Sequence, residues 1–559
     1  MNKENLTAYE VVTEENLTDI HSTGWLLRHK KTGARVMLIE NDDENKVFNI
    51  AFRTPPKDST GVAHILEHSV LCGSREFPLK DPFVELVKGS LNTFLNAMTY
   101  PDKTCYPVAS CNDKDFQNLM HVYLDAVFYP NIYKREEIFR QEGWNYHLEQ
   151  KEGPLKYNGV VYNEMKGAFS SPDEVLEREI MNHLFPDTTY GCESGGDPKN
   201  IPDLTYENFL NFHRTYYHPS NSYIYLYGNM DMEEKLAFLD EHYLSHFDYL
   251  DVDSVIQEQK AFGACRDVTL EYPVAENEGE EDNTYLSYNM VVGNAADSQM
   301  AMAFEVLDYA LLSAPGAPLK QALLDVKAGK DVYGSYDDGI LQPYFTVIAK
   351  GSNPDRKEEF VSVIRQVLGD IVKNGIDKKA VEAGINYFEF RYREADFSSY
   401  PKGLMYSLDI LGDWLYEKGN PFAQVQQLTV FENLKKAVNE GYFEELIRKY
   451  LLENPHGCIM TLVPKKGLAA QREKELEEKL EAYRSSLSEE QLDAMVEKTK
   501  ALEAYQEAGE DPKALECIPM LKRSDIKKEA AKIVNEELTV DNSLFLYHDV
   551  CTNGIGYVD

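Results

Sequence analysis

The sequence predicts an α+β fold in which two tandem units of strands and helices are followed by a helical hairpin. First, runs rich in β-branched and aromatic residues alternate with segments whose apolar residues recur at helical spacing. Second, an order of strands, several helices and a closing strand occurs twice, over residues 1–260 and 261–464. Third, a charge-rich stretch with a helical pattern begins near residue 466. With 559 residues, the chain is also too long for a single hydrophobic core.

The first unit, residues 1–260, is expected to open with two strands, at 35–39 and 47–52. A strand at 222–227 and a helix from about Met232 close it. Between them lies an amphipathic helix, whose apolar side chains recur at helical spacing: Phe116, Leu119, Met120, Tyr123, Leu124 and Val127.

The second unit, residues 261–464, contains an acidic segment at 276–282, which we interpret as a linker before a strand at 284–290. The unit ends in a strand at 458–463. A weak sequence echo between the two units favours a divergent duplication.

The helical hairpin is expected over residues 465–535. A charged helix runs through residues 472–480, and a Ser-rich break follows it. Ser488 and Gln491 have the spacing of a capping box, which starts a second helix. A dimerising coiled coil is the less favoured alternative, because sustained apolar heptads are absent.

The last residues, 536–559, look like the truncated start of a third domain. A strand is expected at 543–550, and a second one begins at 552–558. The same strand, turn and strand order occurs at 35–52. We therefore interpret the chain as an N-terminal fragment, because a strand cut off without partners leaves unpaired edges.

Composition excludes several classes of function. The formal net charge of −37, with no basic stripe to offset it, argues against nucleic-acid binding. No run of about 18 apolar residues occurs, so no membrane span is expected. The first residues resemble neither a signal peptide nor a transit peptide. The eight cysteines form no C-x-x-C pair, which disfavours a cysteine zinc site. Because no export signal is expected, reduced thiols in a cytoplasmic protein are the simplest interpretation.

The run from His64 to His68 is the most informative part of the sequence. Residues i and i+4 share a helix face, so both imidazoles can bind one metal ion, with Glu67 beside them. This is the inverted H-x-x-E-H order of zinc peptidases. Hydroxyl caps at residues 59–60 and a stop at Gly73 are expected to bound the helix. For an isolated pair, two ordinary helix histidines would be the simpler interpretation.

Downstream, Asp81 as N-cap with Pro82 at the first position predicts a helix start. Residues 89–100 and 105–108 form strand-like runs, and Pro101 argues against a central strand there.

Three segments together resemble the pitrilysin clan of inverzincin metallopeptidases, and they are closest to its presequence-protease branch. The resemblance extends over essentially the whole chain. The segments are His64-Ile-Leu-Glu-His68-Ser-Val-Leu-Cys-Gly-Ser74, Asn96-Ala-Met-Thr-Tyr-Pro-Asp-Lys-Thr104 and Gly159-Val-Val-Tyr-Asn-Glu-Met-Lys-Gly167.

The resemblance implies one Zn²⁺ per chain, with His64, His68 and Glu164 as ligands and Glu67 as general base. Without His64 and His68, Glu164 would be interpreted as an exposed helix glutamate. Relatives in the clan carry a further acidic residue one or two turns before the third ligand. Residues 157–163 contain none, so the groups that orient the ligands are not assigned.

The resemblance also implies that an edge strand at Asn96, Ala97, Met98 and Thr99 pairs with an extended substrate peptide. Backbone hydrogen bonds from such an edge give affinity with little side-chain selectivity. On the residues alone, Asn96 could be a turn residue and Met98 could belong to the core.

By the same resemblance, the two units are homologous α+β domains, each an antiparallel sheet packed with helices, and the hairpin links two halves of an enzyme. The expected function is zinc-dependent endopeptidase cleavage of unfolded peptides inside a chamber. In the family the C-terminal half is a partner that adds Arg and Tyr groups to the site. The alternatives are a non-catalytic peptide-binding half, a two-chain peptidase and a metal store or sensor, which Glu67 disfavours.

Overall fold

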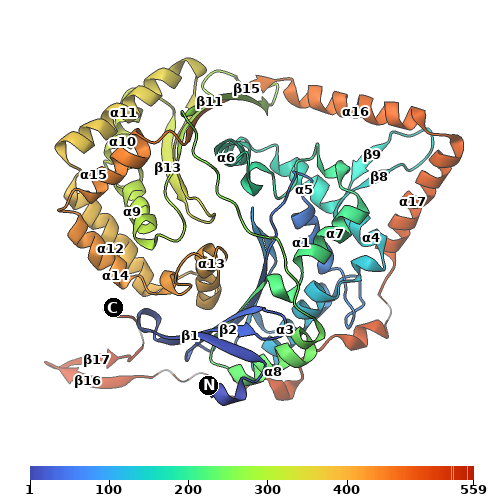
Figure 1. Cartoon of the computed structure of the whole chain (residues 1–559), viewed down its shortest axis with the longest axis horizontal. Coiled ribbons are helices and arrows are strands. Elements are labelled where there is room, and N and C mark those ends of the chain that lie inside the picture. Colours follow the sequence, from blue (N-terminus) through green and yellow to red (C-terminus); the bar gives the residue numbers. More distant parts are fainter. Residues whose placement is uncertain (511, 531, 533, 551) are drawn as a thin grey trace.

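The computed structural model describes the whole chain except residues 511, 531, 533 and 551. Its first unit is built on an eight-stranded sheet in the order β1-β2-β3-β10-β4-β7-β5, with β6 also paired to β7 (Figure 1). The strands are β1 Tyr9–Leu17, β2 Ser22–His29, β3 Arg35–Glu40, β4 Lys46–Arg53, β5 Asn92–Leu95, β6 Met98–Thr99, β7 Lys103–Ser110 and β10 Ser222–Gly228.

The second unit is built on a five-stranded sheet in the order β11-β15-β12-β14-β13. Its strands are β11 Arg266–Val274, β12 Thr284–Val291, β13 Asp331–Asp337, β14 Tyr344–Ser352 and β15 Gly457–Lys466. The acidic segment 276–282 lies between β11 and β12, inside this sheet. The linker interpretation is therefore wrong, because β11 already belongs to the second unit.

Both sheets share one topology, which supports the predicted repeat. In each unit the last strand inserts between two earlier ones. It runs parallel to the first of them and antiparallel to the second: β10 lies between β3 and β4, and β15 lies between β11 and β12. The sheets are therefore antiparallel except for one parallel pair in each. A crossover through helices returns the chain in the same direction, which produces that pair.

The first unit opens earlier than predicted, because the β1–β2 hairpin precedes β3. Along β1 the side chains alternate between less and more exposed positions. The sequence itself shows no clear alternation of apolar and polar residues, since Glu and Thr occupy many of its positions. The polar composition of this edge strand hides it from a search for apolar runs.

The helices cover the faces of the two sheets, and two of them pack on the sheet of the other unit. Helix α3 packs on β7, as its apolar face predicts, but α6 of the first unit packs on β12 and β15 of the second. In return, α13 of the second unit packs on β4 and β10. The helices of the first unit are α1 Val62–Val70, α2 Pro82–Val87, α3 Asp113–Phe128, α4 Glu136–Glu142, α5 Val160–Ala168, α6 Pro172–Leu184, α7 Tyr206–Tyr216 and α8 Met232–His242. Those of the second are α9 Ser298–Asp308, α10 Pro318–Asp325, α11 Lys357–Asn374, α12 Lys378–Glu394, α13 Lys402–Trp414, α14 Leu428–Ala437 and α15 Tyr442–Leu446.

This exchange produces one buried interface between the units. Tyr223 on β10 meets Trp414 on α13 edge to face, with ring centroids 5.0 Å apart. Leu176 and Ile180 of α6 belong to the same apolar cluster as Leu462 of β15. The two units are thus held together by α6 and α13, because each of these helices packs on the sheet of the other unit.

The helical hairpin consists of α16 Leu468–Ser486 and α17 Glu489–Glu507. The capping box is confirmed, because Ser488 accepts from the Gln491 backbone amide and the Gln491 side chain accepts from that of Ser488. The second helix ends at Glu507, so the hairpin expected over residues 465–535 was too long. Between them and the first unit lies a two-stranded ribbon, β8 Asn145–His147 and β9 Lys156–Asn158.

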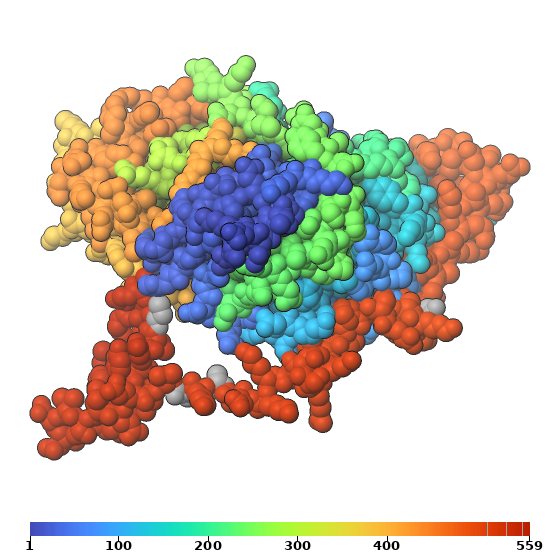
Figure 2. All heavy atoms as spheres, turned by 60° about the horizontal axis from the view of Figure 1, so that its bottom comes forward, coloured from blue at the N-terminus to red at the C-terminus, as the bar shows by residue number. Residues whose placement is uncertain are grey.

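The C-terminal strands differ from the prediction. β17, Ser543–Tyr547, pairs with β16, Glu536–Val540, and not with a later segment. Asp541 and Asn542 join them with φ of 50° and 70°, the backbone of a type I′ turn. The described residues of 552–558 form no strand. Figure 2 shows this hairpin extending from the body of the molecule.

Seven cysteines lie in the described part of the chain, and each carries a free thiol. Among the described helices, none combines the length and the hydropathy of a membrane-spanning segment.

Candidate metal centre

The three predicted metal ligands come together. His64 and His68 lie on α1 and Glu164 lies on α5, and one ligand atom from each falls within 4.8 Å of the others. The Nε2 atoms of His64 and His68 are each 3.8 Å from Glu164 Oε2. In the part of the chain that the structure describes, no other group of three such side chains is close enough to share a metal ion.

Helix α1 begins at a glycine and not at a hydroxyl cap, so that detail of the prediction was wrong. Gly61 is the N-cap residue with φ of 69°, and no side chain caps the helix. A Cβ at this position would lie 2.7 Å from the carbonyl oxygen of Gly195. Thr60 instead donates to Asp58. A glycine here therefore lets the loop around Gly195 approach the start of the helix.

Each histidine is oriented through its Nδ1 atom. His64 Nδ1 lies 3.0 Å from the carbonyl oxygen of Gly195, and His68 Nδ1 lies 3.3 Å from Glu142 Oε2. Because a carbonyl and a carboxylate only accept, Nδ1 carries the proton in both rings and Nε2 is left with its lone pair toward Glu164.

Glu142, at the end of α4, is the orienting carboxylate that the sequence did not reveal. Its side chain is largely buried, and it also accepts from Gln141 at 2.7 Å. Burial raises the pKa of Glu142, but the hydrogen bonds from His68 and Gln141 outweigh burial and lower it. Glu142 is therefore an anion that fixes the His68 ring.

The electrostatics of the site favour a cation. Burial lowers the pKa of His68, but the hydrogen bond to Glu142 and the charges of Glu67, Glu142 and Glu164 raise it above its usual value. A potential that stabilises an imidazolium also stabilises a divalent ion. Two imidazoles and one carboxylate match the three protein ligands of a catalytic zinc site with one open position.

Glu67 on α1 is largely buried, with 9% of its surface exposed. Burial raises the pKa of Tyr106 and Tyr123, and the charge of Glu67 raises it further. Helix α1 also contacts β6 and β7. Glu67 is therefore buried on α1 and close to Tyr106 of β7 and Tyr123 of α3.

The predicted edge strand is divided in two. Met98 and Thr99 form β6, paired with Cys105 and Thr104 of β7, while Asn96 and Ala97 lie in the break between β5 and β6. The hydroxyl of Tyr123 donates to the carbonyl oxygen of Asn96 at 3.1 Å and fixes this break. On their outer side, β5 and β6 pair with no other described strand. The edge is thus free, but the substrate-binding role of these residues stays a prediction.

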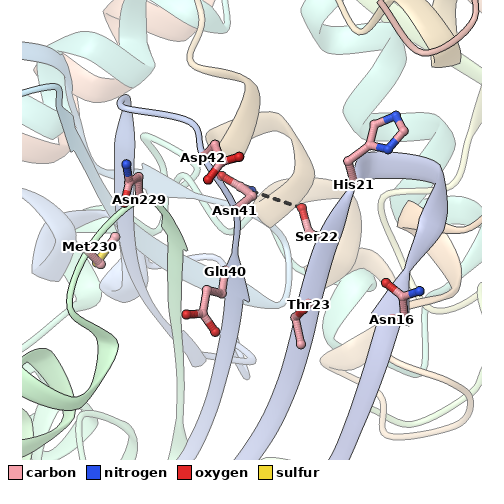
Figure 3. Close-up of a pocket in the computed structure, with 9 residues that line it drawn as sticks. All are labelled: Asn16, His21, Ser22, Thr23, Glu40, Asn41, Asp42, Asn229 and Met230. Atoms are coloured by element: carbon pink, nitrogen blue, oxygen red, sulfur yellow. Dashed lines mark hydrogen bonds between the residues drawn. The ribbon is translucent and has the colours of Figure 1, made fainter. Parts of the chain in front are cut away.

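A separate polar cavity of about 350 Å³ lies at the ends of β1, β2 and β3 (Figure 3). It is lined by Asn16, His21, Ser22, Thr23, Glu40, Asn41, Asp42, Asn229 and Met230. Figure 3 shows the His21 ring and the Glu40 carboxylate at opposite sides of this cavity. None of its lining residues belongs to α1, α4 or α5, so the cavity is not part of the candidate metal centre.

Three family models match the chain. The model described as insulinase (peptidase family M16) matches residues 52–190, and the peptidase M16 inactive domain matches 203–388. A third model, a domain associated with one subfamily of the M16 peptidases, matches 462–559. The first match contains His64, Glu67 and His68.

Curated relatives match nearly the whole chain. A Clostridium perfringens protein called HypA is 51% identical over 99% of this chain and 57% of its own length. Presequence protease 1 of Arabidopsis thaliana, a chloroplastic and mitochondrial protein, is 42% identical over 99% of this chain and 52% of its own length. The chain therefore spans about half the length of the curated relatives that it matches.

Solved structures share the fold at low sequence identity. A protease from Helicobacter pylori aligns with a TM-score of 0.60 and 17% identity over 82% of this chain and 99% of its own. Pitrilysin aligns with a TM-score of 0.56 and 16% identity over 82% of this chain and 47% of its own.

Proposed function

Because this chain belongs to the M16 family of peptidases, we propose that its first unit cleaves unfolded peptides as a zinc-dependent endopeptidase site. One observation carries the proposal. His64 and His68 are each held through Nδ1, so that both Nε2 atoms converge on Glu164. This donor set fits zinc, and Glu67 adjoins it.

Each residue of the candidate metal centre has a distinct proposed role. When bound by His64, His68 and Glu164, a zinc ion would polarise the scissile carbonyl and acidify a water molecule. In this proposal Glu67 accepts a proton from the attacking water and returns it to the leaving amine. Glu142 and the Gly195 carbonyl hold the two imidazoles in the required tautomer.

The free edge of the first sheet supports the choice of substrate. β6 presents unpaired backbone groups beside α1, and an extended peptide can add there as a further strand. A folded protein offers few such extended segments, so unfolded peptides are the proposed substrates. Asn96, Ala97, Met98 and Thr99 are the proposed contact residues.

The test is hydrolysis of a basic, unstructured peptide by the purified chain, with zinc quantified in the same sample. Turnover that a chelator abolishes would support the proposal. Glu67→Gln should retain zinc and lose about 10²–10⁴-fold in turnover, the usual contribution of general acid–base catalysis. Undiminished hydrolysis by Glu67→Gln would overturn the role of Glu67, and absence of zinc from the wild-type chain would overturn the ligand set.

A second candidate is a peptide-binding half without turnover of its own. It is favoured by one observation, that the chain spans about half the length of its curated relatives. Stoichiometric zinc and peptide binding without hydrolysis would support this candidate.

A further inference from the structure

The two carboxylates of the candidate metal centre are joined by a structure that is weak by itself. Between Glu142 and Glu164 the chain forms the β8–β9 ribbon, which has only the pairs Asn145↔Asn158, Tyr146↔Tyr157 and His147↔Lys156. The ribbon pairs with no other described strand. A two-stranded ribbon is marginally stable at best in water, so other packing must hold this one in place.

The helical hairpin supplies that packing. Leu148 and Leu155, which flank the ribbon turn, form a buried cluster with Leu480 of α16 and Val496 of α17. We call these four residues the ribbon cluster. Figure 1 shows the ribbon reaching from the first unit toward the corner where α16 meets α17.

One aromatic contact and one hydrogen bond reinforce the same interface. The ring of Tyr146 stacks on that of Tyr483, with centroids 4.9 Å apart. The backbone amide of Leu148 donates to Thr499 Oγ1 at 3.1 Å. The hairpin thus contacts both the side chains and the backbone of the ribbon.

The base of the ribbon adjoins the two segments that carry Glu142 and Glu164. Gly143 follows Glu142, and Gly159 is the N-cap residue of α5, which carries Glu164. A Cβ at Gly159 would lie 2.2 Å from the Gly143 carbonyl oxygen, so the two segments are pressed together. In addition, Arg140 of α4 donates to the carbonyl oxygen of Lys498 on α17 at 3.2 Å.

We propose that the α16–α17 hairpin positions Glu142 and Glu164 through the ribbon cluster, so that the metal affinity of the site depends on docking of the hairpin. Leu480 and Val496 are positioning residues in this arrangement, although neither touches the metal centre. The inference rests on the proposed function, because it takes His64, His68 and Glu164 as zinc ligands.

The ribbon cluster, and not a charged contact, carries this coupling. Lys166 on α5 also pairs with Glu473 on α16 at 3.0 Å, but the two side chains are 49% and 52% exposed. Exposed ion pairs contribute little because water screens them. Glu473→Gln is therefore expected to change metal affinity less than about twofold.

The experiment compares zinc affinity in three variants of the same helix, by competition with a chromophoric chelator. Leu480→Ala should weaken zinc binding by about 10–100-fold, the range typical of lost orienting groups. Leu480→Met, which conserves volume, should restore most of the affinity. Leu468→Ala is the matched control, because Leu468 is also a buried leucine of α16 but lies outside the ribbon cluster.

Two further measurements make the outcome decisive. Hydrogen exchange of residues 145–158 should accelerate in Leu480→Ala and not in Leu468→Ala, and the absorption spectrum of the Co²⁺-loaded protein should change in the same variant alone. Equal zinc affinity in the wild type and a folded Leu480→Ala would overturn the inference, as would equal losses in Leu480→Ala and Leu468→Ala. Failure of the wild type to bind zinc would instead overturn the proposed function.

Discussion

The two sheets of this molecule have the same strand topology, but only one carries candidate catalytic groups. In the first unit β4 is followed by α1, which presents His64, Glu67 and His68. In the second unit β12 is followed by α9, Ser298–Asp308, which contains no histidine. The shared topology places a helix after β4 in the first sheet and after β12 in the second. Two histidines on that helix, together with Glu164 on α5, and not the shared topology, decide whether a metal centre can form.

Helices α1 and α9 also place a glutamate in different electrostatic environments. Glu67 on α1 lies beside two imidazoles that can share a metal ion. Glu305 on α9 lies near Asp308 and Asp338; burial and these two charges raise the pKa of Glu305 to about 8. The charge of Arg391 lowers this pKa only in part, so the second unit keeps an acidic side chain in an unfavourable setting.

The largest expected effect comes from removing one ligand of the first unit. His64→Ala should reduce bound zinc from one equivalent to none and abolish peptide hydrolysis, since two ligands do not make a catalytic zinc site. Metal analysis after gel filtration checks this. His456→Gln is the matched control, because His456 is the single histidine of residues 261–464. If this control also loses its zinc, the contrast between the two units is wrong.

The second prediction concerns Glu142. Glu142→Gln removes the charge that orients His68 and should weaken zinc binding by about 10-fold or more, which chelator competition measures. Glu76→Gln provides the comparison, because Glu76 also pairs with a histidine, His121, at 3.1 Å but lies outside the metal centre. Loss of affinity in both variants would point to a general electrostatic effect and not to orientation of His68.

The third prediction tests the exchange of helices between the units. A Cβ at Gly403 of α13 would lie 2.1 Å from Tyr227 Cδ1 on β10, so Gly403→Ala overpacks the interface. We expect a loss of about 1–3 kcal/mol in unfolding free energy, measured by denaturant titration. Gly412 lies on the same helix with nothing within 4 Å of its added Cβ. Gly412→Ala should therefore gain about 0.5–1 kcal/mol from helix propensity, and a loss there would contradict the argument.

The fourth prediction is a change of pH dependence in the second unit. Because the folded-state pKa of Glu305, about 8, lies above the ordinary 4.5, the folded chain binds more protons than the unfolded one between these values. This contribution to stability is complete below about pH 4.5 and is lost as the pH rises through 8. Glu305→Gln removes it, so the Tm of the variant relative to wild type should rise from about pH 5 to about pH 8. Parallel Tm profiles would contradict the assigned cause.

The sequence was sufficient wherever local spacing carries the information. The i and i+4 histidines of α1 and the capping box at Ser488 depend on neighbours within one or two helical turns. The strands around the predicted runs at 35–39 and 458–463 were found because they are buried on both faces and read as continuous apolar segments.

What the sequence did not reveal depends on contacts between distant segments. Glu142 resembles any other glutamate of the chain until folding brings it to His68. The exchange of α6 and α13 has no local signature either, because each helix shows only that it has an apolar face and not which sheet it covers. The Asp541–Asn542 turn does have a local signal, and recognising its type I′ chemistry would have placed β16 correctly.

The inserted strand of each sheet has a consequence for the synthesis of the protein. Until Ser222–Gly228 leaves the ribosome, the strands before it can form only two half-sheets, β1-β2-β3 and β4-β7-β5, with an open slot between them. The same slot recurs beside β11 until Gly457–Lys466 arrives. Closing such a slot joins segments that are far apart in the chain, which is a slow step. Strand edges stay exposed until this step is complete. Nascent chains of this protein should therefore depend on chaperones at two stages of elongation, each ending when one short strand emerges.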